Sequence, residues 1–262
     1  MIIAQISDTH IDLDGPNSAA RLRNLEDCVV DINRLDPLPD VVIHTGDLSQ
    51  NGKPAEYEAA RRLLDALRCP LHVAAGNRDE RAALRSAFPA DDYLLPDTLF
   101  VQYRSDAFPV RLIAVDTLSE SSNQGDFCQI RAENLRAALA EDTTKPTAIF
   151  MHHPPFEVRE SKYPFQFEAW ESVERMSRVL EGQRQVVAVF CGHTHRDAAG
   201  EIAGVPVSSM PSVAVDLRLG SYSDELQSVP LYKLHRLDAQ QRFVSEIRAA
   251  RQRQALPAGN AG

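Results

Sequence analysis

Seven residues of metal-ligating types directly follow short apolar runs in this sequence. Five such runs each end in one or two of them, and the seven are Asp8 and His10, Asp47, Asn77, His152, and His193 with His195. Their side chains offer carboxylate oxygens, an amide oxygen and imidazole nitrogens, but no thiolate. This donor set suits iron, manganese, zinc or cobalt and disfavours a structural zinc site. The sequence therefore predicts a metal site.

The short motifs that contain these residues are weak when each is taken alone. Asp-x-His at 8–10 occurs by chance in many proteins, and Gly46–Gly52 is compatible with an ordinary turn. Gly76–Asp79 is compatible with a turn before a helix that Asp79 caps. Gly192–His195 is the most specific, because two histidines that flank one residue after a glycine often chelate a metal. Together with His152–Pro155, all the motifs in this order are improbable by chance.

Histidine usage supports the same interpretation. Five of the eight histidines lie in these motifs, and the other three are His44, His72 and His235. His44 and His72 lie within apolar segments, so we interpret them as structural residues of the core.

The predicted ligands need a scaffold that brings distant segments together, and the first 77 residues provide one. Buried strands are predicted at Ile2–Ile6, Val41–Ile43 and Leu71–Ala75, with helices at 18–35 and 54–67 between them. This order predicts a parallel sheet with helical crossovers. Because ligands bind beyond the carboxyl ends of the strands in open α/β sheets, we expect the five strand ends to converge on one point.

The second half of the chain looks richer in strands. Two strands are expected at Thr147–Met151 and Val186–Cys191, and two helices at 131–140 and 170–181. A hairpin is expected from Phe100–Tyr103 and Val110–Val115, with the polar residues 104–106 between them. Closing antiparallel strands are expected around Ile202, around Val205 and Val207, and at Leu231–Leu237.

Length and charge limit the classes of function. The 262 residues suit one domain, which we expect at 1–254, followed by a disordered tail at 255–262. The net charge of −9 argues against a nucleic-acid polymer or an anionic membrane as partner. A small phosphorylated substrate remains compatible, because bound metal ions can invert the local field.

The sequence also indicates a compartment. The N-terminus lacks the features of a signal peptide, and no apolar run is long enough to span a membrane. The spacing of the four cysteines suggests neither a zinc knuckle nor a disulfide framework. We therefore expect reduced thiols and a cytoplasmic protein.

The order of the motifs resembles the calcineurin-like metallophosphoesterase superfamily. The motifs are D-x-H, G-D-x-x-x-x-G, G-N-x-D, H-H-P-P and G-H-T-H, and the resemblance spans residues 1 to about 210. Within the superfamily, the sequence is similar to class III cyclic-nucleotide phosphodiesterases and glycerophosphodiesterases. The resemblance implies an α/β fold, a four-layer αββα sandwich of two mixed sheets flanked by helices.

The resemblance also implies how the ligands are shared between two divalent or trivalent metal ions. Asp8, His10, Asp47 and His195 would hold the first ion. Asp47, Asn77, His152 and His193 would hold the second, so that Asp47 bridges the two. Two cations roughly 3.5–4 Å apart neutralise phosphoryl oxygens and deprotonate a bound water, which then attacks the phosphorus as hydroxide.

One position departs from the family pattern. The third motif usually reads Asn-His-Asp, and its histidine contacts phosphate and protonates the leaving oxygen, but here the residue is Arg78. An arginine stays protonated and is a poor proton donor, although it can bind a phosphoryl oxygen. We therefore place Asn77, Arg78 and His153 among the catalytic candidates. His153 would orient His152, contact substrate or simply be exposed.

Three functions follow from the resemblance. The leading one is hydrolysis of small phosphodiesters, such as cyclic nucleotides or glycerophosphodiesters. The alternatives are a phosphomonoesterase or protein phosphatase, and a non-catalytic metal-binding scaffold. The aromatic-rich segment 154–170 is expected to form a substrate lid or a subunit contact, since relatives in this branch often form homo-oligomers.

Overall fold

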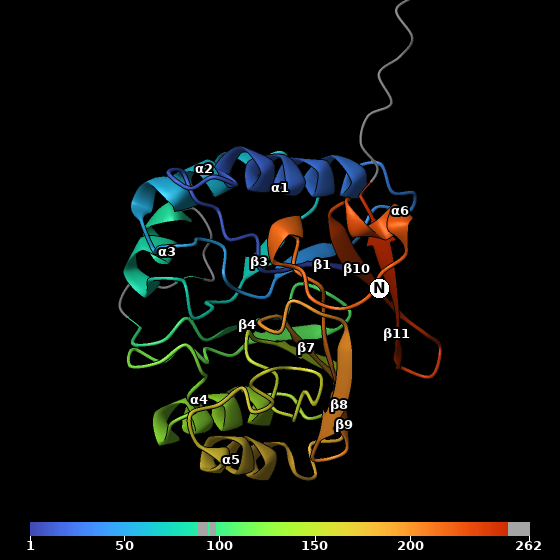
Figure 1. The fold of residues 1–262 in the computed structure, drawn as a ribbon. Coiled ribbons are helices and arrows are strands. Elements are labelled where there is room, and N and C mark those ends of the chain that lie inside the picture. Colours follow the sequence, from blue (N-terminus) through green and yellow to red (C-terminus); the bar gives the residue numbers. More distant parts are fainter. Residues whose placement is uncertain (89–93, 95–97, 251–262) are drawn as a thin grey trace, which may run out of the picture.

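Two β-sheets stacked face to face form the centre of the protein, and helices cover their outer faces (Figure 1). The computed structural model describes residues 1–88, 94 and 98–250. The helices α1 (Ser18–Ile32), α2 (Pro54–Leu64) and α3 (Arg81–Ala87) cover one sheet. The helices α4 (Gln129–Ala140) and α5 (Trp170–Leu180) cover the other. This arrangement confirms the predicted αββα sandwich.

The first sheet has the strand order β11-β10-β1-β2-β3. Its strands β1 (Ile2–Ile6), β2 (Val41–His44) and β3 (Leu71–Val73) are parallel, as predicted. The strands β10 (Leu231–Leu237) and β11 (Phe243–Ala249) extend it in the antiparallel sense. A mixed sheet results, because β10 returns to pair with β1, the first strand of the chain, and β11 pairs with β10.

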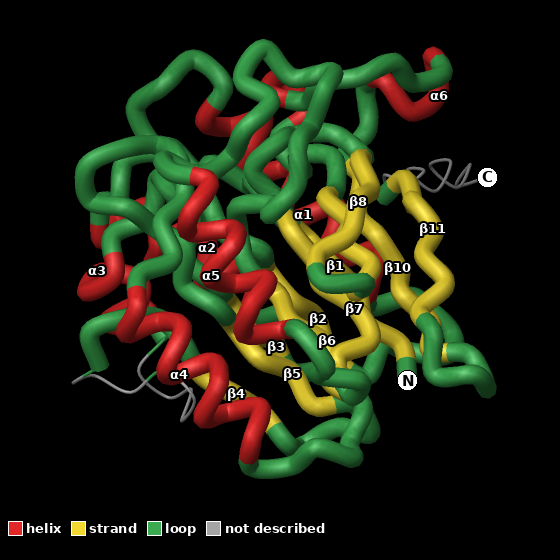
Figure 2. Tube along the Cα trace, turned by 90° about the horizontal axis from the view of Figure 1, so that it is seen from below, coloured by secondary structure: helices red, strands yellow, loops and turns green. Residues whose placement is uncertain are grey.

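The second sheet has the order β4-β5-β6-β7-β9-β8 (Figure 2). The strands β5 (Arg111–Ala114), β6 (Thr147–Phe150), β7 (Val186–Cys191) and β9 (Val205–Ser209) are parallel. The edge strands β4 (Tyr103–Ser105) and β8 (Ala198–Ile202) are antiparallel to their neighbours. Between β9 and β10 lie the 3₁₀ helix η1 (Val215–Leu217) and the short helix α6 (Asp224–Gln227).

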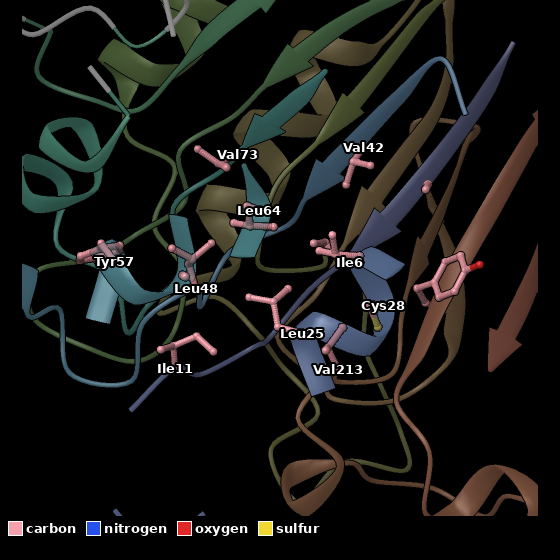
Figure 3. Close-up of a cluster of buried hydrophobic side chains, with 14 of the residues drawn as sticks. Ile6, Ile11, Leu25, Cys28, Val42, Leu48, Tyr57, Leu64, Val73 and Val213 are labelled. Carbon is pink, nitrogen blue, oxygen red and sulfur yellow. The ribbon is translucent and has the colours of Figure 1, made fainter. Parts of the chain in front are cut away.

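Three apolar layers explain why the strand sequences are apolar almost without interruption. In β1, Ile6 packs toward the helices, near Leu25 of α1 (Figure 3). Ala4 belongs to the same apolar cluster, whereas Ile3 packs between the sheets. In β6, Ile149 faces α4 and α5, and Phe150 faces the opposite sheet. Both faces of the central strands are thus buried, as is usual for strands in the middle of α/β proteins.

Several predicted boundaries and pairings were wrong. In the hairpin, Arg104 and Ser105 belong to β4 rather than to the turn, because an edge strand accepts polar side chains. The strand at Val205 runs parallel to β7, and only its pairing with β8 is antiparallel. The strand β11 was not predicted. The helix α3 begins two residues after Asp79, where the alternative interpretation of Gly76–Asp79 places a helix. The predicted tail at 255–262 lies outside the described residues.

No helix in the described ranges is both long enough and apolar enough to span a bilayer.

Candidate metal centre

The seven predicted ligands converge at the carboxyl ends of β1, β2, β3, β6 and β7. One group joins Asp8, His10, Asp47 and His195, whose potential ligand atoms all lie within 4.8 Å of one another. In this group, His10 Nε2 lies 3.1 Å from His195 Nε2, and His195 Nε2 lies 3.3 Å from Asp8 Oδ1. We call these four residues the first cluster.

The second cluster contains Asn77, His152 and His193. Asn77 Oδ1 lies 3.0 Å from His152 Nε2 and 2.9 Å from His193 Nδ1. The two histidine nitrogens are 3.2 Å apart. An amide oxygen and two imidazole nitrogens therefore surround one point, as three ligands of a cation would.

Asp47 connects the two clusters. Its Oδ2 lies 3.4 Å from His10 Nε2 in the first cluster and 3.4 Å from His152 Nε2 in the second. Its other oxygen, Oδ1, accepts a hydrogen bond of 2.7 Å from the backbone N–H of Arg78. The carboxylate is therefore held by the backbone and reaches both clusters with one oxygen.

The hydrogen bonds on the far side of the rings show that the donor set fits cations. His10 Nδ1 donates to Gln50 Oε1 and His195 Nδ1 donates to the Leu217 carbonyl, both at 3.0 Å. In a neutral ring that donates from Nδ1, the lone pair lies on Nε2, and the two Nε2 atoms face each other. Two lone pairs so close need a proton or a cation between them. The nearby carboxylates of Asp8 and Asp47 favour a divalent cation.

The second cluster has the same kind of support. His152 Nδ1 donates to the Thr45 carbonyl at 2.8 Å, so Nε2, which would carry the lone pair in the neutral ring, faces Asn77 and Asp47. An acceptor on the second ring nitrogen, which fixes the tautomer and the ring plane, is typical of metal-binding histidines. Thr45, Gln50 and Leu217 were not predicted from the sequence.

The backbone at the ligands is strained. Of the seven non-glycine residues with positive φ in the described part of the chain, five are predicted ligands: Asp8, His10, Asp47, His193 and His195. Side chains rarely adopt this left-handed conformation, which occurs mostly where a function requires it. The strain therefore marks the strand ends as a functional site.

Two glycines let the ligand loops approach closely. A Cβ atom on Gly76 would lie 2.3 Å from Asp47 Oδ1, and one on Gly192 would lie 2.6 Å from Asp8 Oδ2. Any side chain at either position would displace a predicted ligand. These contacts explain why a glycine precedes both Asn77 and His193 in the motifs.

Asp79 ties two of the ligand loops together. Its buried carboxylate accepts hydrogen bonds from the backbone N–H groups of Gly76, Leu48 and Ser49. Burial, with a contribution from Asp47, raises the pKa of Asp79 to about 6. Glu80, not Asp79, caps α3, because its carboxylate accepts from Ala82 N and Ala83 N.

The charges of the clusters are those of a cation site. Burial alone would raise the pKa of Asp8, but His195 lowers it to about 2. Burial likewise opposes ionisation of Asp47, yet His152 holds the pKa of this carboxyl well below its ordinary value. Both carboxylates are thus negatively charged at neutral pH. The pKa of His10 falls to about 4 through burial, so its ring is neutral.

His153 lies behind the second cluster. Its Nδ1 accepts a hydrogen bond of 2.8 Å from Thr117 Oγ1, and its Nε2 donates to the Asn123 carbonyl. The ring is fully buried, and its centroid is 4.8 Å from that of His152 and 4.3 Å from that of His193. These contacts favour the predicted orienting role over contact with substrate.

Arg78 stands at the open side of the site. It is exposed, and no described residue forms an ion pair with its guanidinium. Pairing with Glu80 is not observed, because both carboxylate oxygens of Glu80 cap α3.

His44, which was predicted to be a structural residue of the core, is buried. Its Nδ1 accepts a hydrogen bond from the Gly46 N–H, as expected of a core residue.

Several known proteins are similar to this chain in sequence or in fold. A probable glycerophosphodiester phosphodiesterase GpdQ of Arcobacter nitrofigilis is 31% identical over 90% of this chain and 88% of its own. The cAMP/cGMP dual specificity phosphodiesterase of Mycobacterium tuberculosis is 29% identical over 79% of this chain and 65% of its own. The crystal structure of a dimetal phosphatase from Danio rerio has a TM-score of 0.71 at 17% identity, covering 96% of this chain and 97% of that chain.

The family model of the calcineurin-like phosphoesterases matches residues 1–197, a range that contains both clusters. The chain therefore belongs to the calcineurin-like phosphoesterase family.

Proposed function

We propose that the protein hydrolyses small phosphodiesters at a centre of two metal ions. Asp8, His10, Asp47 and His195 would hold one ion, and Asp47, Asn77, His152 and His193 would hold the other. The position of Asp47 Oδ2, 3.4 Å from a histidine nitrogen in each cluster, is the observation on which this proposal chiefly rests. Iron, manganese, zinc and cobalt suit this mixture of nitrogen and oxygen ligands.

Two bound cations would neutralise phosphoryl oxygens and lower the pKa of a water molecule between them. The protein supplies the geometry for this chemistry. The backbone N–H of Arg78 holds the bridging carboxylate, and the carbonyls of Thr45 and Leu217 set the planes of His152 and His195. His153 packs against His152 and His193 and keeps water from the inner side of the second cluster.

The substrate is a small diester of the glycerophosphodiester or cyclic-nucleotide type. The names of the relatives from Arcobacter nitrofigilis and Mycobacterium tuberculosis support this class. Arg78 is the exposed cation next to Asn77 and binds a non-bridging phosphoryl oxygen through charge-assisted hydrogen bonds. Since a guanidinium does not give up its proton, the leaving oxygen takes its proton from elsewhere, and good leaving groups react fastest.

The segment 154–170 borders the site and exposes three aromatic side chains. Tyr163, Phe165 and Trp170 are 66%, 50% and 47% exposed, and Phe165 packs edge-to-face on Trp170. We propose that this segment forms either a substrate lid or a contact in a homo-oligomer.

We also propose that the protein resides in the cytoplasm.

We expect diesters to be better substrates than the matching monoesters. A diester carries one negative charge less than a monoester dianion, so two cations and one arginine suffice to bind it. The test compares kcat/KM for bis(p-nitrophenyl) phosphate and p-nitrophenyl phosphate with the same metal and pH. A monoester preference of about tenfold or more, equivalent to about 1.4 kcal/mol, would assign the protein to the phosphomonoesterases instead.

A further inference from the structure

We propose that Arg21 is a positioning residue that orients both histidines of the first cluster, His10 and His195. The proposal rests on the proposed metal centre and adds a residue outside the ligand motifs. Arg21 lies in the first turn of α1, and only 8% of it is exposed. A buried guanidinium must find partners for its donors, so its contacts define what it holds in place.

One arm of the guanidinium supports His10. Arg21 Nη1 donates to Gln50 Oε1 at 3.2 Å, and the same oxygen accepts from His10 Nδ1 at 3.0 Å. Arg21 Nη1 also donates to the backbone carbonyl of His10 at 3.0 Å. Arg21 therefore fixes the amide orientation of Gln50, and with it the ring tautomer that turns the His10 Nε2 lone pair toward the cluster.

The other arm supports His195. Arg21 Nη2 donates to Asp216 Oδ2 at 2.8 Å, and Arg21 Nε donates to the same carboxylate at 3.2 Å. Asp216 lies in η1, whose next residue, Leu217, accepts the hydrogen bond from His195 Nδ1 through its carbonyl. The two-point ion pair thus anchors the turn that sets the plane of the His195 ring.

The second cluster does not depend on this network. His152 is held by the Thr45 carbonyl at the end of β2, and His193 packs against His153 on the other side of the site. No described hydrogen bond connects Arg21 with either residue. Loss of Arg21 should consequently weaken one metal site and spare the other.

The test titrates metal-free protein with Mn²⁺ and follows both the affinities and the electron paramagnetic resonance spectrum. In Arg21→Met, which keeps the apolar stem, we expect one affinity to fall by roughly 10- to 100-fold, as for other residues that orient metal ligands. The other affinity should stay within about twofold. At one equivalent the spectrum should show isolated Mn²⁺, and spin coupling should appear only at higher concentration.

Two further variants separate positioning from folding. Arg131→Met removes another buried arginine, which lies on α4 and pairs with Asp126, so it should lower the melting temperature without changing either affinity. Asp216→Asn removes the negative partner of Arg21 at a partly exposed position and should weaken the same single site. It keeps the inference testable if Arg21→Met does not fold.

The outcomes distinguish this inference from the proposed function. Wild-type protein that binds fewer than two ions would refute the proposed metal centre itself. Wild-type protein with two ions, together with Arg21 and Asp216 variants that lose both sites equally or neither, would refute only the role of Arg21.

Discussion

Asp47→Ala is expected to lose both metal ions and essentially all diester hydrolysis in a single substitution. Asp47 Oδ2 lies 3.4 Å from a histidine nitrogen in each cluster, so its removal weakens both sites together. Two-metal catalysis contributes several kcal/mol to transition-state stabilisation, so the rate should fall by roughly a thousandfold or more. Elemental analysis of the purified variant and kcat/KM on a diester measure the two effects.

Two controls accompany this variant. Asp47→Asn keeps an acceptor for the Arg78 N–H and removes only the charge, so loss of metal in it reports on the carboxylate itself. Asp116→Asn changes another buried carboxylate, one that pairs with Arg81 away from the clusters, and should retain both ions. Two full metal equivalents with normal activity in Asp47→Ala would refute the bridging assignment.

Arg78→Ala is expected to lower kcat/KM for diesters and to leave the metal content intact. A charge-assisted hydrogen bond is worth about 1.5–3 kcal/mol, which corresponds to a loss of roughly 10- to 150-fold. Arg178→Ala is a matched control, because it removes one exposed arginine on α5, on the outer face of the other sheet. Kinetics with a series of leaving groups should show that poor leaving groups react disproportionately slowly in the wild type.

The variant Arg78→His tests the second half of this argument. An imidazole titrates near neutral pH and can protonate a departing oxygen, which a guanidinium cannot. The variant should therefore gain more on substrates with alkoxide leaving groups than on nitrophenyl esters. Unchanged kinetics in Arg78→Ala with both good and poor leaving groups would place Arg78 outside the site.

The convergence of the predicted ligand residues could be foreseen because strand ends are easy to recognise. Apolar runs such as Val186–Cys191 end before a glycine, and the predicted ligand His193 follows at once. Parallel strands place such ends at one edge of a sheet, so convergence follows from topology alone. The strands β1, β2, β6 and β7 are buried on both faces, so their sequences are almost entirely apolar, and for this reason they could be predicted.

Other features depend on contacts that no local pattern records. Gln50, Leu217 and Arg21 act through hydrogen bonds to residues distant in the sequence, and Leu217 does so through its backbone carbonyl, which carries no sequence signal. The parallel pairing of β9 with β7 depends on hydrogen bonds between strands that are not adjacent in the sequence, so no local pattern predicts it. The strand β11 has three consecutive exposed residues, Val244–Glu246, and α3 spans only seven residues, so neither has a strong periodicity.

The most direct test of the account is an anomalous difference map from crystals of the protein grown with Mn²⁺. We expect two peaks roughly 3.5–4 Å apart, as in other two-metal sites. One should lie among Asp8, His10 and His195, the other among Asn77, His152 and His193, with the carboxylate of Asp47 between them. A single peak, or two peaks that Asp47 does not bridge, would contradict the binuclear centre on which the proposed hydrolysis depends.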